Sequence, residues 1–161
     1  MSRIVLSILL LSFIASCGFK PVYAKENSGA YYELQNIKIE PVQGRTGQVL
    51  TSKLHDLINP ENKYSNSNYN LKIELKRERR DLGIQENLRI TRYDVILTAK
   101  YALVDNATGQ NIDSGVARIK SSFNRTESEF STYVAEQDAE EKAAEELAEE
   151  IRTRLMIFFT K

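Results

Sequence analysis

The sequence predicts an α+β fold, a two-layer sandwich in which two helices cover one face of a four-stranded mixed/antiparallel sheet. Four segments carry apolar residues at strand spacing, and two carry them at helical spacing. Their order is β-α-β-β-β-α, so one sheet could bury both helical stripes. A helix between the first two strands permits parallel pairing there, whereas the later strands should pair as antiparallel hairpins.

Composition narrows the functional classes before any motif is considered. The chain has 161 residues, of which 42% are hydrophobic and 27% charged, as expected for a single globular domain. Basic and acidic side chains number 22 each, which disfavours a nucleic-acid-binding protein. One Cys and one His cannot supply a four-ligand zinc site or an intrachain disulfide. We therefore expect that the protein is not an enzyme and that it holds neither a metal ion nor a cofactor.

The first sixteen residues predict a cleaved signal peptide rather than part of the fold. Arg3 precedes an apolar run over residues 4–14. That run is too short to cross a hydrocarbon core of about 30 Å as a helix. A basic start, a short apolar segment and small residues after it are typical of secretion signals.

Residues 14–17, Ile-Ala-Ser-Cys, resemble the lipobox of bacterial lipoproteins. The thiol of Cys17 would take a diacylglyceryl group, and cleavage before it would free an amine for a further acyl chain. Each buried methylene contributes about 0.8 kcal/mol, so two or three chains make a lasting anchor. Gly18, in place of Asp, favours sorting to the outer membrane. Ordinary cleavage after Ala24 is the alternative, and it would leave no cysteine.

We expect residues 17–30 to form a lipid-anchored tether and residues 31–161 a single domain. The first strand is predicted over residues 31–42, ending at Pro41. Thr46 is a plausible N-cap for the following helix, which Asn59-Pro60 would end. The apolar stripe of this helix consists of Val49, Leu50, Leu54, Leu57 and Ile58. His55 lies beside that stripe and is interpreted as a rim residue.

Three further strands are predicted. Residues 69–76 alternate strictly between apolar and polar side chains, and residues 88–105 form the longest candidate. In the latter, Leu88 and Ile90 have the wrong parity for the apolar face, which predicts a bulge or a bend near Thr91. A turn signal then leads to a strand over residues 111–124. The expected core face of the long strand is Tyr93, Val95, Leu97, Ala99, Tyr101 and Leu103.

A long helix is predicted over residues 129–159. Its apolar stripe consists of Ala143, Ala144, Leu147, Ile151, Leu155 and Phe158. The early part is strongly acidic, and the basic residues come later, which suits the helix dipole. We interpret the acidic run as a solvated face.

Several stretches together resemble the lipopolysaccharide-assembly lipoprotein family (LptE type), particularly its alphaproteobacterial branch. They are Cys-Gly-Phe-Lys-Pro-Val-Tyr at 17–23, the segment 92–105, the Thr108-Gly109 turn, and residues 134–139 leading to 151–155. Only Cys17 can be transferred as a functional residue, because the family offers no other site motif for this chain.

The resemblance implies a function. Family members are anchored in the inner leaflet of the outer membrane, on the periplasmic side, and plug the large β-barrel LptD. The complex inserts lipopolysaccharide into the outer leaflet, and some members bind lipopolysaccharide themselves. The implied fold, a four-stranded sheet with two helices, agrees with the element order above. The alternative function is a structural or adaptor lipoprotein of another periplasmic envelope machine.

Two groups of residues are candidates for contact with these partners. The first is a basic cluster at the end of the second strand, whose guanidinium groups suit the phosphates of lipopolysaccharide. Its members are Lys76, Arg77, Arg79, Arg80, Arg89 and Arg92. The alternative is a charged hairpin protected from edge pairing. The second is the outward face of the long strand, with Ile96, Ala102 and Val104. It would be covered by other side chains or dock against the barrel.

Overall fold

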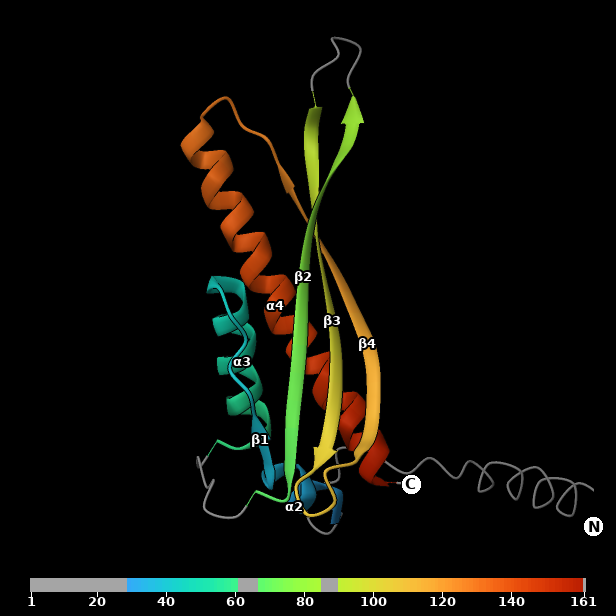
Figure 1. The fold of residues 1–161 in the computed structure, drawn as a ribbon. Helices are drawn as coiled ribbons and strands as arrows, with labels where there is room; N and C mark the ends of the chain where they lie inside the picture. The colour runs from blue at the N-terminus through green and yellow to red at the C-terminus, as the bar shows by residue number, and fades with distance from the viewer. Residues whose placement is uncertain (1–28, 61–66, 85–89, 161) are drawn as a thin grey trace, which may run out of the picture.

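A computed structural model describes residues 29–60, 67–84 and 90–160 (Figure 1). The predicted signal peptide, Cys17, most of the tether, Leu88 and Arg89 lie outside the described residues. The helices are α2 (Gly29–Gln35), α3 (Arg45–Ile58) and α4 (Glu129–Thr160). The strands are β1 (Ile37–Ile39), β2 (Tyr69–Ile84), β3 (Ile90–Asp105) and β4 (Asn111–Asn124).

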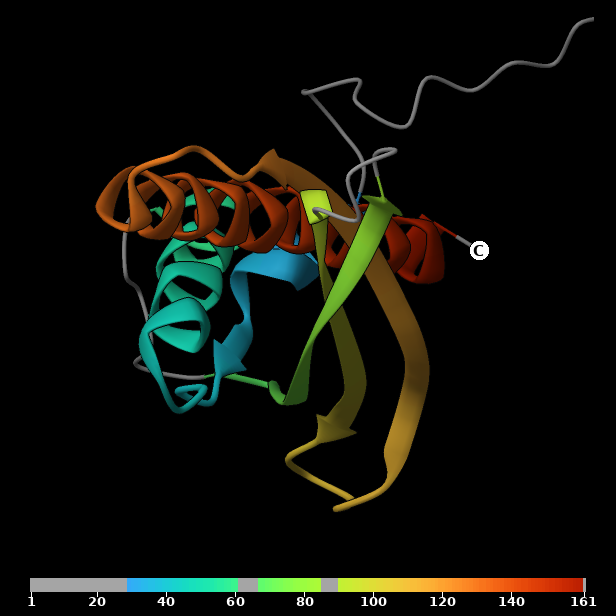
Figure 2. The same ribbon diagram turned by 90° about the horizontal axis from the view of Figure 1, so that it is seen from above.

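The predicted fold class is confirmed. The four strands form one sheet in the order β1-β2-β3-β4. β1 pairs with β2 in parallel, and the other two pairings are antiparallel. α3 and α4 pack on the same side of this sheet, and Figure 2 shows α4 crossing its long strands. A third helix, α2, joins the same core.

The prediction of a strand over residues 31–42 is wrong in its N-terminal part, because residues 29–35 form a helix. α2 begins two residues before the predicted start of the domain. Ala30 and Leu34 lie one helical turn apart and are both buried. Leu34 and Ile37 would point to opposite faces of a continuous strand. A change from helix to strand between them allows both to face the core, and only Ile37–Ile39 pairs with β2.

α3 confirms the predicted apolar stripe but not the predicted cap. Leu50, Leu54 and Ile58 are buried on its inner face. The helix is preceded by Gly44, whose φ of 84° favours a residue without a side chain. Thr46 lies inside the helix, and its hydroxyl donates a hydrogen bond of 3.0 Å to Glu140 instead of capping α3.

β2 runs to Ile84, eight residues beyond its predicted end. It stays paired with β3 in one register, from Tyr69 opposite Asp105 to Ile84 opposite Ile90. Of the two irregularities predicted near Thr91, a bulge or a bend, the bulge is therefore absent from this ladder. The register shift that the structure does contain lies between Leu103 and Val104, where β3 pairs with β4.

α4 provides most of the buried side chains of the helical layer. Its predicted inward stripe is confirmed, since Leu147, Ile151 and Leu155 are fully buried. Small side chains on both layers, such as Ala144 on α4 and Ala99 on β3, are also fully buried and allow close approach of helix and sheet. The predicted core face of the long strand likewise points toward the helices.

Gly47 provides a test of the tight entry into α3. A Cβ at this position would lie 2.8 Å from the carbonyl oxygen of Val42, which is backbone and cannot rotate away. Gly47→Ala should therefore destabilise the protein by about 1–3 kcal/mol through overpacking, although Ala is ordinarily the better helix former. Thermal unfolding followed by circular dichroism measures the effect.

Gly29→Ala is the matched control, because a Cβ there meets nothing within 4 Å. This variant should stay within about 0.5 kcal/mol of the parent. A stabilising effect of Gly47→Ala would contradict the packing described for α3.

Candidate functional site

The predicted basic cluster is divided between the two faces of the sheet. Because side chains alternate along a strand, Arg77 and Arg79 point toward α4, whereas Lys76 and Arg80 point to the open face. Arg92 is exposed on β3, opposite Leu82 of β2. The structure therefore does not bring the five described members together as one patch, and Arg89 lies outside the described residues.

Arg77 and Arg79 form an ion-pair network with two carboxylates of α4. Arg77 donates hydrogen bonds to Glu136 and Glu140, and Arg79 Nη1 lies 3.0 Å from Glu136 Oε2. Glu136 and Glu140 are each only 8% exposed. The prediction of a wholly solvated acidic face on this helix is wrong at these two positions, because β2 extends far enough to cover them.

The network fixes the charge of its central guanidinium. Burial opposes the charged form of Arg77, but the hydrogen bonds and negative charges of Glu140 and Glu136 outweigh it and raise the pKa of Arg77. Thr46 supplies a further donor to Glu140, so α3 is tied to the same carboxylate. Three elements, α3, β2 and α4, thus meet at one charged junction.

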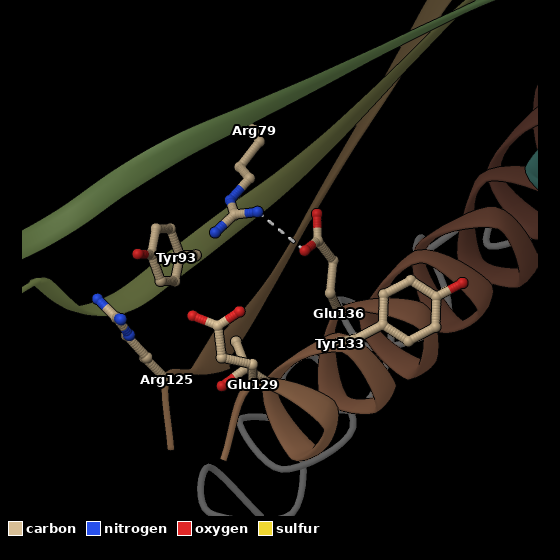
Figure 3. Close-up of a pocket in the computed structure, with 7 residues that line it drawn as sticks. Arg79, Tyr93, Arg125, Glu129, Tyr133 and Glu136 are labelled. Atoms are coloured by element: carbon tan, nitrogen blue, oxygen red, sulfur yellow. Dashed lines mark hydrogen bonds and ion pairs between the residues drawn. The ribbon is translucent and has the colours of Figure 1, made fainter. Parts of the chain in front are cut away.

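A pocket of about 350 Å³ opens beside this junction, between the first turns of α4 and the sheet (Figure 3). The guanidinium of Arg79 lies 4.1 Å from the ring centroid of Tyr93. Tyr93 in turn stacks on Phe123 at 5.3 Å between centroids. The other lining residues are Arg125, Glu129, Thr132, Tyr133 and Glu136.

Sequence reasoning did not single out the pocket residues Arg125, Glu129 and Tyr133. They come from the end of β4 and the start of α4, which meet β2 only after folding. The pocket combines aromatic rings with charges of both signs, a surface suited to binding polar groups. Within the described parts of the chain, no cluster of His, Cys, Asp and Glu is arranged to hold a metal ion.

On the open face, the predicted docking residues differ in accessibility. Ile96 lies between Glu78 of β2 and Lys120 of β4 in the register and is only 3% exposed. Ala102 and Val104 are half-buried. The accessible apolar surface of this face therefore comes from Ala102, Val104, the 53% exposed Val116 and the 37% exposed Leu82.

Asp94 lies on the open face of the sheet near Ile96 and interacts with two side chains of β4. Its carboxylate accepts a hydrogen bond of 2.5 Å from Ser122 and pairs with Lys120 at 3.3 Å. The Ser122 hydrogen bond, and after it the Lys120 charge, hold the pKa of Asp94 below its ordinary value although burial acts against them. The partners of this carboxylate are therefore neighbouring side chains of the sheet.

Basic side chains outnumber acidic ones on the open face. Lys76 and Arg80 both pair with Glu78, at 2.9 Å and 3.3 Å. By register the basic side chains of this face are Lys38, Lys72, Lys76, Arg80, Arg92, Lys100, Arg118 and Lys120, and the acidic ones are Glu74, Glu78 and Asp94, together with Glu40, which pairs with Lys72 at 3.8 Å. The open face of the sheet therefore offers a mainly basic surface to an anionic partner.

His55 lies on the partly buried outer part of α3. Burial lowers its pKa, and the neighbouring charge of Asp56 opposes that shift only in part. The position agrees with a rim histidine.

Comparison with known proteins identifies the family. The model of the LptE family, described as lipopolysaccharide-assembly, matches residues 34–155. This chain belongs to the LptE family. The match begins in α2 and ends in α4, so it covers the sheet, the charged junction and the pocket.

Further comparisons give one relative in sequence and two solved structures that share the fold of this LptE-family chain. An uncharacterized protein of Rickettsia prowazekii (strain Madrid E) is 27% identical over 154 residues, which is 96% of each chain. A protein of Caulobacter crescentus CB15 has the same fold, with a TM-score of 0.67 at 20% identity over 81% of this chain and 96% of its own.

A minor lipoprotein of Acinetobacter baumannii also shares the fold, with a TM-score of 0.56 at 16% identity. That match covers 75% of this chain and 88% of the other. The LptE family is a non-enzymatic family of lipopolysaccharide-assembly lipoproteins. Among the described helices, none is both long and apolar enough to span a bilayer.

The charged junction can be tested by a double-mutant cycle between Arg77 and Glu140. Glu140→Ala should destabilise the protein by about 1–2 kcal/mol, because it leaves Arg77 and Thr46 without their shared acceptor. Arg77→Ala added to that variant should cost about 1 kcal/mol less than in the parent. Urea unfolding followed by circular dichroism measures all four proteins.

Glu146→Ala is the control, since Glu146 is an exposed carboxylate on the same helix. It should change stability by less than about 0.5 kcal/mol. Strictly additive effects of the Arg77 and Glu140 substitutions would show that this ion pair contributes no coupling free energy to stability.

Proposed function

We propose that this chain is an outer-membrane lipoprotein that plugs and stabilises an LptD-type β-barrel and assists assembly of lipopolysaccharide at the outer leaflet. The observation that carries the proposal is the family match across residues 34–155, which spans nearly the whole described fold. In this proposal the signal peptide ends at residue 16. A lipid on Cys17 then holds the domain on the periplasmic side, without enzymatic activity and without a further cofactor.

The open face of the sheet is the proposed contact for lipopolysaccharide. Lys76, Arg80 and Arg92 of the predicted cluster point there or lie exposed, next to Lys100 and Arg118. Guanidinium and ammonium groups on one surface suit the phosphates of lipopolysaccharide. Arg77 and Arg79, by contrast, are held in ion pairs with α4, so we assign them to the structure of the junction.

Ala102 and Val104 lie on the same open face and remain the proposed docking residues for the barrel. Ile96 belongs to this group by position, but it offers little accessible surface. A single face would then carry an apolar part for the barrel and a basic part for the lipid.

Purification of C-terminally tagged protein from native outer membranes in mild detergent tests the proposal. Mass spectrometry should find a stoichiometric large β-barrel together with lipopolysaccharide. The variant Lys76→Ser/Arg80→Ser/Arg92→Ser should retain the barrel and lose most of the lipopolysaccharide, because it removes positive charge only from exposed positions.

The matched control is a variant with Lys53→Ser on α3, which changes a basic residue on the opposite layer. It should retain both the barrel and the lipid. Recovery of the protein with other envelope components and without any barrel would support the adaptor function instead. Unchanged lipopolysaccharide in the triple variant would contradict the assignment of the open face.

A further inference from the structure

The two ends of the molecule differ in their relation to the proposed lipid anchor. α2, where the described chain begins, lies at the same end as the C-terminus, and the start of α4 lies at the other (Figure 1). We call the first the near end, made of α2 and the last two turns of α4. α4 has 32 residues and is about 48 Å long, so the two ends are far apart.

Aromatic and aliphatic side chains gather at the near end. Tyr32 on α2 is 66% exposed, and Ile157 on α4 is 45% exposed. The rings of Phe159 and Tyr69 lie 5.3 Å apart between centroids at an interplanar angle of 48°, and Phe159 meets Phe158 edge to face at 5.0 Å. Burial, and after it the carboxylate of Glu33 on α2, raise the pKa of Tyr69, so α2 and the end of α4 both lie beside this ring.

The near end carries charges of both signs, so the aromatic side chains and not a net charge characterise it. α4 carries Arg152 and Arg154 there, of which Arg154 pairs with Glu150 at 2.7 Å, and α2 carries Glu33. In the turn between β3 and β4, at the same end, the Asp105 carboxylate accepts hydrogen bonds from the backbone N–H groups of Ala107 and Thr108. Tyr and Phe next to basic side chains are typical of surfaces that contact the headgroup region of a bilayer.

Chain length brings this end to the membrane. The twelve residues from 18 to 29 reach at most about 40 Å when fully extended. An anchor on Cys17 therefore keeps α2 near the bilayer, where even a weak contact is populated because its effective concentration is high. The start of α4 lies beyond α2 by a further helix length.

We propose that the near end is a second membrane contact, in which Tyr32, Ile157 and Phe158 rest in the headgroup region of the leaflet that holds the lipid anchor. This inference rests on the proposed anchoring at Cys17. It assigns a lipid surface, rather than the barrel wall, as the partner of these side chains. The contact would fix the long axis of α4 relative to the membrane instead of leaving the domain free to swing on its tether.

The absence of Trp from the sequence makes the test direct. Tyr32→Trp and Phe130→Trp each place one fluorophore at an exposed position, the first at the near end and the second in the first turn of α4, where Phe130 is 76% exposed. The acylated protein is reconstituted without the barrel into vesicles of phosphatidylethanolamine and phosphatidylglycerol, with or without brominated acyl chains.

The Tyr32→Trp protein should show a blue-shifted emission and lose most of it in brominated vesicles, whereas the Phe130→Trp protein should keep its emission. The proposal would be overturned if each variant had the same emission intensity in brominated as in unbrominated vesicles. Quenching of the Phe130→Trp protein alone would also overturn it. Shielding of Tyr32→Trp only after the barrel is added would assign the near end to the barrel.

Flotation of the same vesicles reports the anchor separately. If the protein floats with the vesicles but its tryptophan is not quenched, the lipid anchor is retained and only the proposed near-end contact is refuted. If the protein does not float, both the proposed anchor and the proposed contact are refuted. Neither result depends on barrel capture, which tests the proposed function by itself.

Discussion

The packing of one long helix along a long antiparallel ladder is the constraint on which the rest of this structure depends. α4 contacts the sheet with two kinds of chemistry. From Ala143 to Met156 its inner face is apolar and fully or almost fully buried. One to two turns earlier, Glu136 and Glu140 occupy the same face and meet Arg77 and Arg79 of β2. The apolar part supplies the free energy of burial, and the charged part sets where along the helix the extended hairpin lies.

This arrangement leaves one face of the sheet without a helix, and the LptE-family assignment gives that face a role. Carboxylates of α4 hold Arg77 and Arg79 of β2, whereas Lys76 and Arg80 of the same strand point to the open face. Ile96 is already buried there, whereas Ala102, Val104 and Val116 keep accessible apolar surface. The near end adds a third surface of different composition, with exposed aromatic and aliphatic side chains. An anchored protein with these three surfaces could contact lipid, a barrel and lipopolysaccharide at the same time.

Much of the fold could be predicted from the sequence because its elements have clear periodicity. The strict alternation over residues 69–76 and the stripe of α4 each specify an element and its buried face. The errors arose where polar residues are buried by tertiary contact. Residues 77–81 carry no apolar alternation, so the extension of β2 could not be predicted from the sequence. The burial of Glu136 and Glu140 depends on that extension and could not be predicted either. The helix at residues 29–35 was missed because Leu34 and Ile37 fit a strand individually but not together. The pocket residues Arg125, Glu129 and Tyr133 gave no local signal at all.

Hydrogen exchange along α4, resolved by mass spectrometry of its peptides, tests the two-part packing most directly. Backbone amides from Ala143 to Met156 should exchange slowest, because they open only when the core opens. Amides from Glu129 to Glu141 should exchange faster, and raising the salt concentration should accelerate exchange only in this part, since ion pairs are screened and apolar contacts are not. Uniform protection along the whole helix, or an equal effect of salt on both parts, would contradict this account of how α4 is held.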